Sequence, residues 1–493
     1  MAGPDASTHL VDDEALARAR DRLAEALRAS GMQAGERVAI LCGTRPEMIA
    51  AREATAALGL VAAPLDPRLT APEVAYSLAH ARPRALLVEP GREPAAAAAL
   101  DRMLPIRRPE LVPLAPVPAG PGGAGRARPP ARGVAPDTIG ATLLYTSGTT
   151  GRAKGCMRSA EKEAARAAEL VATYRIAPED VHLVACPLAY SAPGILTRAG
   201  RAVGARTALL PRFSADQFLD VVAATRASLF FLVPTQLQRL LALPAELRRR
   251  ADLAAVRAVI VAGAPLAPAL RRAAVDWLGE GRLWEFYGSS ETGTITVLRP
   301  EEQLAHADSV GRPAAGVELR VEPTAGAEEG AGEIWVRSPT VMSGYWNPVT
   351  QEVEWPGTAE GFVTVGDLGR LDDAGYLHLI DRLHDTIISG GVNVYPAEVE
   401  RALVEHPEVA GAVVFGVADD EWGQRVAALV VRAHGSTVTA EELRAFAGGR
   451  LARHKVPRQI AFVAPDDLPR TSSGKPLRRA ASALLRRLDP PPS

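Results

Sequence analysis

Lysine is scarce in this chain of 493 residues: lysine and arginine together number 56, and only four of these are lysines. Even so, Lys154 stands near glycine and hydroxyl residues, and Lys475 ends the run Thr471-Ser-Ser-Gly-Lys. An ammonium group is a compact charge on a flexible stem, which suits a phosphate or carboxylate oxygen. The other two lysines, Lys162 and Lys455, have no such surroundings, and chance placement on a solvated surface accounts for them.

Other features that the sequence lacks exclude whole classes of protein. Its three scattered cysteines form neither a disulfide framework nor a pair of metal ligands. The net charge is −1 and no basic block occurs, which argues against a nucleic-acid partner. No run approaches the about 18 apolar residues of a membrane span, and the first residues lack the basic and apolar segments of a secretory signal. We therefore expect a cytoplasmic protein with no membrane span, either a monomer or a homodimer.

The length and the hydrophobic pattern predict a multidomain α/β protein. A chain of this length exceeds what one hydrophobic core holds. Buried-strand runs alternate with helical patterns along the first half, which favours layers of mostly parallel sheet flanked by helices. The strand runs are residues 37–42, 61–65, 206–210, 229–232 and 258–262. Residues 105–137, rich in Pro, Gly, Ala and Arg, are predicted to form a long irregular loop.

The pattern changes in the second half of the chain. After Gly332 short β segments predict a small β-subdomain, and beyond Asp381 the pattern predicts a small α+β unit. We expect a large N-terminal domain over residues 1–382 and a small, mobile C-terminal domain over residues 383–493.

Residues 143–155 read Leu-Leu-Tyr-Thr-Ser-Gly-Thr-Thr-Gly-Arg-Ala-Lys-Gly. An apolar run enters a loop with four hydroxyls and two glycines, and a lysine follows. Glycines let the backbone fold around an anion, while hydroxyls and amides donate hydrogen bonds to it. The segment predicts a polyphosphate cradle, although its spacing is not that of the Walker A loop. An ordinary surface turn of the same composition is the alternative.

Five further segments follow in order: Phe286-Tyr-Gly-Ser-Ser-Glu-Thr-Gly, Gly366-Asp, Asp381-Arg-Leu-His-Asp, Ile388-Ser-Gly-Gly-Val-Asn-Val-Tyr-Pro-Ala-Glu-Val-Glu and Pro469-Arg-Thr-Ser-Ser-Gly-Lys-Pro. With these segments the chain resembles the adenylate-forming superfamily over nearly its whole length. It is most similar to the fatty and aryl acid–CoA ligases. The resemblance implies that ATP and a carboxylate form an acyl-adenylate and pyrophosphate, after which a thiol, usually that of CoA, takes the acyl group.

The resemblance also implies roles for individual residues. The phosphate loop would hold the β- and γ-phosphates of ATP through Thr146, Ser147, Gly148, Thr149, Thr150 and Lys154. Glu291 would help to hold Mg²⁺, which prefers hard oxygen ligands, and Thr292 would touch the α-phosphate. Tyr287, with Gly288 and Ser289 after it, would pack on the adenine opposite Gly263, Ala264 and Pro265. Asp367 would bind the ribose hydroxyls beside Arg382.

Lys475 would bridge the substrate carboxylate and the α-phosphate as the two anions meet. In the family the small domain then rotates, and a Ser-Gly-Gly loop replaces the lysine loop. Gly390 and Gly391 would let a pantetheine arm pass close to the backbone, and Trp422 would stack on the CoA adenine. His384 stands at the hinge position, where Asp or Lys is more usual. On the residues alone, Lys475 could equally be solvated and Trp422 could equally be a surface-packing aromatic.

The sequence departs from the family in two places. Near the phosphate loop Ala153 replaces a proline, and the histidine usual after the lysine is missing. In Pro187-Leu-Ala-Tyr-Ser-Ala-Pro, Ala189 stands for an aromatic residue and Tyr190 for a histidine that lies against the carboxylate in the family. Tyrosine keeps a hydrogen-bond donor but lacks the histidine's charge near neutral pH. We therefore expect an altered acid site, with Tyr190 among the catalytic residues.

These expectations leave several functions open. The first is an ATP-dependent acid–CoA ligase that uses ATP, Mg²⁺ and CoA. The second keeps adenylation but changes the acid or the acceptor: amide formation with an amine, loading of a carrier protein, or activation of nitrite for diazotisation of an aryl amine. The third, a degenerate scaffold or regulatory binder without activity, is disfavoured because the phosphate loop, Glu291, Asp367, Arg382 and Lys475 are all retained.

Overall fold

The computed structural model describes residues 9–105, 108–117, 139–146, 153–324, 329–389, 392–419, 422–470 and 477–488. The chain forms two compact units. The first comprises Met1–Ala307, Ala314–Glu318 and Arg337–Val363, and the second comprises Asp308–Pro313, Leu319–Val336 and Thr364–Ser493. The predicted boundary between residues 382 and 383 stays a prediction. Among the described residues no helix is both long and apolar enough to cross a bilayer.

The first unit contains a sheet in which neighbours in space are far apart in sequence. Its strand order is β17-β16-β6-β5-β2-β1-β3-β4. β1 to β5 run parallel where they pair, whereas β6, β16 and β17 are antiparallel to their neighbours. The strands are β1 (Arg37–Leu41), β2 (Val61–Leu65), β3 (Ala85–Val88), β4 (Glu110–Pro113), β5 (Thr142–Thr146), β6 (Lys154–Arg158), β16 (Gly344–Asn347) and β17 (Glu352–Glu354). The helices are α1 (Asp13–Ala29), α2 (Pro46–Ala57), α3 (Ala71–Ala81) and α4 (Glu93–Leu100).

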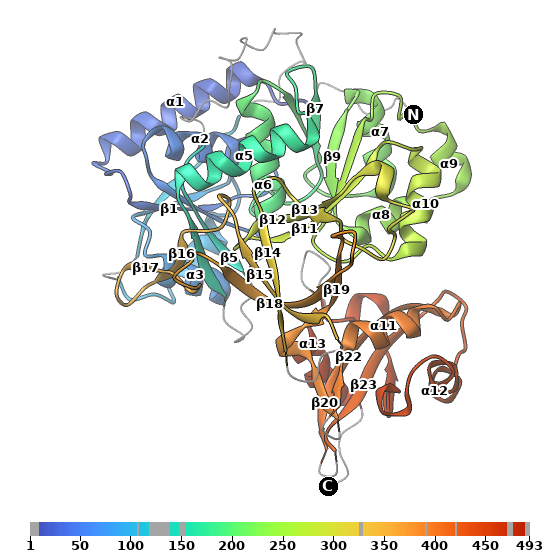
Figure 1. Ribbon diagram of the computed structural model, residues 1–493. Coiled ribbons are helices and arrows are strands. Elements are labelled where there is room, and N and C mark those ends of the chain that lie inside the picture. Colours follow the sequence, from blue (N-terminus) through green and yellow to red (C-terminus); the bar gives the residue numbers. More distant parts are fainter. Residues whose placement is uncertain are drawn as a thin grey trace. The chain divides into compact units, whose positions relative to one another are not determined.

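A second sheet of this unit has the order β12-β11-β10-β9-β7-β8, parallel except for β12. Its strands β7, β9, β11 and β12 are labelled in Figure 1. Its strands are β7 (Val181–Val184), β8 (Arg206–Leu209), β9 (Leu229–Leu232), β10 (Ala258–Val261), β11 (Leu283–Ser289) and β12 (Gly293–Leu298). The accompanying helices are α5 (Ala160–Tyr174), α6 (Ser191–Ala202), α7 (Ala215–Thr225), α8 (Pro234–Leu241), α9 (Ala245–Arg250) and α10 (Pro268–Leu278).

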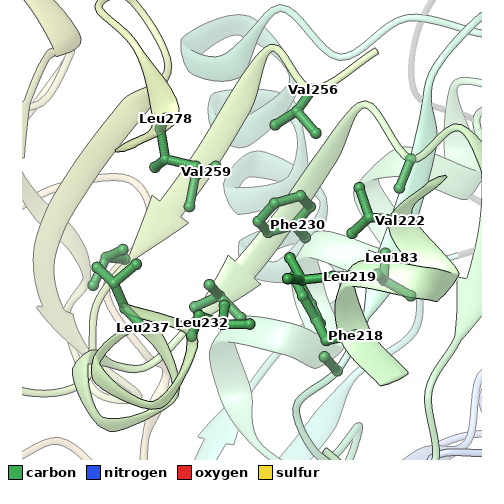
Figure 2. Packing of buried hydrophobic residues seen from close by; sticks show 14 of the residues in the cluster. Leu183, Phe218, Leu219, Val222, Phe230, Leu232, Leu237, Val256, Val259 and Leu278 are labelled. Carbon is green, nitrogen blue, oxygen red and sulfur yellow. The ribbon is translucent and has the colours of Figure 1, made fainter. Parts of the chain in front are cut away.

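Both faces of the second sheet are buried, and its central strands β9 and β10 are apolar throughout rather than alternating with polar residues. Phe230 and Val259 point to one face, where they pack with Leu219 and Leu278 from the helices (Figure 2). Phe231, the next residue along β9, belongs to a different cluster on the opposite face with residues of α5 and α6. Successive side chains of a strand point to opposite faces, and this accounts for the division.

The second unit contains two further sheets. The first has the order β14-β15-β18-β19 and matches the predicted β-subdomain: β14 (Glu318–Pro323), β15 (Ala331–Arg337), β18 (Val363–Leu371) and β19 (Leu377–Arg382). The other has the order β21-β20-β23-β22, with β24 parallel to β23. Its elements are β20 (Ile387–Ser389), β21 (Val392–Val394), β22 (Val409–Asp419), β23 (Gly423–Arg432), β24 (Gln459–Phe462), α11 (Pro396–Val404), α12 (Ala440–Gly448) and α13 (Arg478–Leu488). The two-residue β13 (Arg312–Pro313) also belongs to this unit.

The predicted α/β class is confirmed, with one local correction. Residues 105–137 were expected to be irregular throughout, but Glu110–Pro113 forms β4 and pairs in parallel with β3. β4 is an edge strand of the sheet and is partly exposed, so its four residues do not form the continuous apolar run that predicts a buried strand. Residues 106–107 and 118–137 of the predicted loop lie outside the described residues.

Candidate active site

Glu291 lies at the centre of a small polar cluster in the first unit. It sits in the turn between β11 and β12, and the residue is only 7% exposed. Its Oε1 accepts a hydrogen bond of 2.9 Å from Thr146 Oγ1, at the end of β5, and one of 3.2 Å from the Tyr345 hydroxyl on β16. The structure therefore joins two predicted site residues, Thr146 and Glu291, across the two sheets.

The turn that carries Glu291 is fixed by its own side chains. Ser289 Oγ accepts hydrogen bonds from the backbone N–H groups of Glu291 and Thr292, both at 3.1 Å. The Thr292 hydroxyl accepts from Ser289 N–H at 3.0 Å and is fully buried. At Gly288 an added Cβ would lie 2.0 Å from the Gly293 carbonyl oxygen, so only glycine fits there. These contacts position Glu291; the predicted contact of Thr292 with the α-phosphate stays a prediction.

Lys154 begins β6, and its Cα pairs with that of Thr146 in the β5–β6 ladder. This antiparallel pairing brings the two ends of the phosphate loop together. The Lys154 ammonium lies 5.1 Å from the centre of the Tyr345 ring, within the range of a cation–π contact. The loop residues Ser147, Gly148, Thr149 and Thr150 lie outside the described residues, so their predicted role is not tested.

Tyr345 is a site residue that the sequence analysis missed. Burial and the neighbouring Glu291 carboxylate raise the pKa of its hydroxyl well above the usual value, so it remains a neutral donor. Its segment, Gly344-Tyr-Trp-Asn, contains no spacing that connects it with the phosphate loop. Only the pairing of β16 with β6, where Tyr345 lies opposite Cys156, reveals its position.

The predicted adenine-binding residues lie at one edge of the second sheet. β10 ends at Val261, just before Gly263, Ala264 and Pro265, and its parallel neighbour β11 carries Tyr287. The carboxyl ends of parallel strands form the usual ligand edge of an open α/β sheet. Tyr287 is half-buried there. An adenine site between Tyr287 and the Gly263 segment stays a prediction.

Tyr190 directly precedes α6, and its side chain contacts a buried carboxylate that the sequence analysis also missed. Its hydroxyl donates to Asp66 Oδ2 at 2.8 Å. Arg68 donates to the same carboxylate through Nε, 3.0 Å from Oδ1, and Nη2, 2.6 Å from Oδ2. Burial alone would raise the pKa of Asp66, but the bonds from Arg68 and Tyr190 hold it below its usual range. The carboxylate is therefore ionised near neutral pH, and Tyr190 is held against it.

The sequence contained a signal for Asp66. The segment Asp66-Pro-Arg68 directly follows the buried strand β2, and a polar residue at the carboxyl end of a strand is a frequent site residue.

Buried arginines connect the Glu291 turn with the Tyr190 segment. Arg158 donates to the Ser290 carbonyl at 2.8 Å and pairs with Glu163 at 2.6 Å. Arg166 donates to Ser191 Oγ at 2.7 Å, beside Tyr190. Burial opposes ionisation of Glu163, but Arg198 and Arg158 lower its pKa to about 2. Removing one partner of a buried ion pair destabilises a protein, because it leaves the other charge buried and unpaired. The arginines are therefore fixed, and they hold the Glu291 turn and the Tyr190 segment in place.

The second unit contains the predicted ribose-binding pair. Asp367 on β18 and Arg382 on β19 are cross-strand partners, and Arg382 Nε lies 3.0 Å from Asp367 Oδ1. The structure therefore brings these two residues together as the sequence suggested. Their binding of ribose stays a prediction.

The remaining predicted residues are described only in part. Arg458 covers the Trp422 ring, with its guanidinium carbon 4.6 Å from the ring centre, so one face of that ring already has a partner. His384 lies in a short 3-10 helix, Leu383–Asp385, and its side chain is not described. Gly390, Gly391 and Lys475 lie outside the described residues.

Comparison with known proteins agrees with this arrangement. The family model for "AMP-binding enzyme" matches residues 14–346, and that for "AMP-binding enzyme C-terminal domain" matches residues 398–475. The chain is 36% identical to the indoleacetate–CoA ligase of Aromatoleum aromaticum over 471 residues, covering 92% of this chain and 89% of that protein. It is also 36% identical to the feruloyl-CoA synthase of an Amycolatopsis species over 474 residues, covering 94% of this chain and 91% of that protein.

Among solved structures the chain is similar to the amide bond synthetase McbA of Marinactinospora thermotolerans. The TM-score is 0.81 with 34% sequence identity, over 95% of this chain and 94% of that one. The two family models and the relatives at 36% identity lead to the same assignment. The chain belongs to the AMP-binding enzyme family, the adenylate-forming superfamily that its motifs resemble.

Proposed function

We propose that this protein is an ATP-dependent aryl acid–CoA ligase. It joins the carboxylate of an aromatic acid to AMP, releases pyrophosphate, and then passes the acyl group to the CoA thiol. The observation that carries the proposal is the cluster in which Glu291 accepts hydrogen bonds from Thr146 and Tyr345 while Lys154 lies over the Tyr345 ring. This cluster places one carboxylate and one ammonium group at the two ends of the phosphate loop.

The donor set at Glu291 fits Mg²⁺. Among the described residues no group of three His, Cys, Asp or Glu side chains could form a metal cage. Mg²⁺ seldom needs one, because it is usually held by one or two carboxylates, several waters and the phosphates of its nucleotide. Glu291 would hold the ion, with the Thr146 hydroxyl beside it. When bound, Mg²⁺ would neutralise charge on the phosphates.

The protein's own residues supply the remaining steps. Lys154 would balance charge on the leaving pyrophosphate, and Lys475 would balance the charge that builds up as the carboxylate meets the α-phosphate. Asp367 and Arg382 would hold the ribose. The ionised Asp66, paired with Arg68, fixes the hydroxyl of Tyr190 and so sets the wall against which the substrate carboxylate would lie.

Two relatives favour an aromatic acid. The similar proteins from Aromatoleum and Amycolatopsis are named for indoleacetate and for a feruloyl group.

A panel of acids tests this proposal. We expect pyrophosphate release with at least one aryl or arylalkyl acid, and acyl-CoA in the product when CoA is present. Benzoates, phenylacetates, phenylpropenoates, straight-chain fatty acids and nitrite would each be assayed with and without CoA. Pyrophosphate release with none of the carboxylic acids would contradict the proposal. If CoA neither accelerates pyrophosphate release nor yields an acyl-CoA thioester, CoA is not the acceptor.

Amide formation is the second candidate, since Tyr190 and Ala189 replace the family's histidine and aromatic residue and the chain is similar to an amide bond synthetase. In this version the adenylate forms in the same way, but an amine nitrogen attacks the acyl carbonyl instead of a thiol. The Tyr190 hydroxyl, fixed by Asp66, carries no charge near neutral pH, unlike a protonated histidine.

Substitution of Tyr190 separates these two candidates. Tyr190→Phe removes one hydrogen-bond donor to the buried Asp66. We therefore expect kcat/KM to fall roughly five- to a hundredfold, which corresponds to a rise of about 1–3 kcal/mol in the activation free energy. With CoA and an amine in competition, Tyr190→His should shift the product toward thioester if the native product is an amide. An unchanged rate and product ratio in both variants would show that Tyr190 does not act in the acid site.

A further inference from the structure

The helix α3 contacts strands that carry the polar cluster around Glu291. Tyr145, on β5, donates its hydroxyl hydrogen to the Ser77 carbonyl at 2.7 Å. Trp346, on β16, donates from Nε1 to the His80 carbonyl at 2.9 Å. Each of these two strand residues stands next in sequence to a member of the cluster. The helix therefore supports two of the strands that form the candidate active site.

A third contact from α3 reaches the start of β6. The Tyr76 hydroxyl donates to the Ala153 carbonyl oxygen at 2.9 Å, although the two residues are 77 positions apart. Ala153 directly precedes Lys154, the first residue of β6. The carbonyl oxygen belongs to the peptide group that joins these two residues. Tyr76 therefore holds the backbone from which the Lys154 side chain projects.

The backbone is also confined on the other side of Lys154. An ideal Cβ added at Gly155 would lie 2.9 Å from Leu143 Cδ1 and 3.0 Å from His80 Cε1, closer than ordinary van der Waals contact. Lys154 thus lies between a peptide group that is bonded to α3 and a glycine that is packed against α3. The position of its backbone depends on this helix.

Ala153 is one of the positions at which the chain departs from its family, whose members usually have a proline there. A proline ring fixes φ at about −65°, whereas alanine leaves that angle free and so has more conformations to lose. A hydrogen bond to the carbonyl group of the same residue restricts the backbone in another way. The Tyr76 side chain therefore supplies a restriction that the proline ring would have supplied.

We propose that Tyr76 is a positioning residue for adenylation: its hydrogen bond to Ala153 takes the place of the family's proline and holds Lys154 where the terminal phosphates of ATP bind. The inference rests on the ATP-binding part of the proposed function, because it takes the role of Lys154 from there. Tyr76 acts through Lys154 and not on the nucleotide itself. Its loss should therefore weaken the binding of nucleotides that carry β- and γ-phosphates.

Tyr76→Phe tests this inference, because it removes only the hydroxyl that binds Ala153. The measurement is calorimetric titration of the full chain with Mg²⁺ and α,β-methylene-ATP, which cannot be cleaved between its α- and β-phosphates, and separately with AMP. We expect the Kd of α,β-methylene-ATP to rise about three- to tenfold, the usual effect of one neutral hydrogen bond. The Kd of AMP, which has no β- or γ-phosphate, should stay unchanged.

Ala153→Pro shows whether the hydrogen bond replaces the proline. In the Tyr76→Phe background it restores the ring that restricts this residue, so the Kd of α,β-methylene-ATP should return to within about twofold of the wild-type value. In the wild-type background the same substitution should change this Kd little, because Tyr76 already restricts the peptide group. Effects that do not add in this way indicate that the two groups act on the same part of the backbone.

Two further variants serve as references. Tyr174→Phe removes a buried hydroxyl that has no hydrogen-bond partner within the described part of the chain, and it should change neither affinity. Lys154→Ala removes the ammonium group itself, so it should weaken the binding of α,β-methylene-ATP at least as much as Tyr76→Phe does.

Equal weakening of both nucleotides by Tyr76→Phe would show a general structural role, and no weakening would show no role; either result would overturn the inference. A selective loss that Ala153→Pro does not restore would show that the bond does not replace the proline. An unchanged affinity in Lys154→Ala would exclude the residue through which Tyr76 is inferred to act, and would overturn the inference as well. The titrations need no acid, so failure of every acid in the panel would refute the proposed ligase without changing their outcome.

Discussion

Replacing Lys475 with alanine is expected to abolish adenylate formation and leave the second half-reaction largely intact. In the family this lysine lies between the substrate carboxylate and the α-phosphate, where two anions must approach each other. Losing one group that stabilises charge in a transition state costs about 100- to 1000-fold in rate. The thiol attack does not need that charge, because the family rotates its small domain between the steps. The measurement is pyrophosphate exchange, compared with product formation from a synthetic acyl-adenylate.

Lys455→Ala is the matched control for Lys475→Ala. It removes another of the four lysines, from the same part of the chain, but its ammonium pairs with Glu398 at 2.8 Å. We expect this variant to retain pyrophosphate exchange. Equal loss of both half-reactions in Lys475→Ala would contradict the division of work between the two steps.

The second large effect is expected for Glu291→Gln, which keeps the shape of the side chain but removes its charge. A neutral amide is a poor ligand for Mg²⁺ beside phosphates, so the metal-dependent step should slow by about 100- to 1000-fold. The concentration of Mg²⁺ that gives half-maximal pyrophosphate release should also rise. Titrating Mg²⁺ at saturating ATP and acid measures both quantities.

An exposed glutamate in the same unit, Glu301, supplies the comparison. Glu301→Gln changes the net charge by the same amount and should leave the Mg²⁺ titration unchanged. If Glu291→Gln also leaves the titration unchanged, the role of Glu291 is limited to holding Thr146 and Tyr345 in place. A loss of rate without a shift in the Mg²⁺ requirement would support the same conclusion.

The sequence by itself determined the family and the fold class, and it predicted which residues bind ATP. Those features are local: a hydroxyl-rich loop after a strand, a short motif around Glu291, and the lysine of the carboxy-terminal Ser-Ser-Gly-Lys run. Apolar runs such as residues 61–65 and 258–262 also predicted strands that the structure contains, because strands buried on both faces need continuous apolar residues.

Only the tertiary structure decided which side chains share the site. The Thr146–Glu291 hydrogen bond joins residues 145 positions apart, and the Tyr190–Asp66 bond joins residues 124 apart. Tyr345 reaches Glu291 because β16 pairs with β6 in the first sheet. No hydrophobic periodicity in residues 344–347 predicts this pairing. The partner of the unusual Tyr190 depends in the same way on how helices and strands pack. Hydrophobic periodicity encodes which face of an element is buried, whereas the element that covers that face is settled only when the whole chain folds.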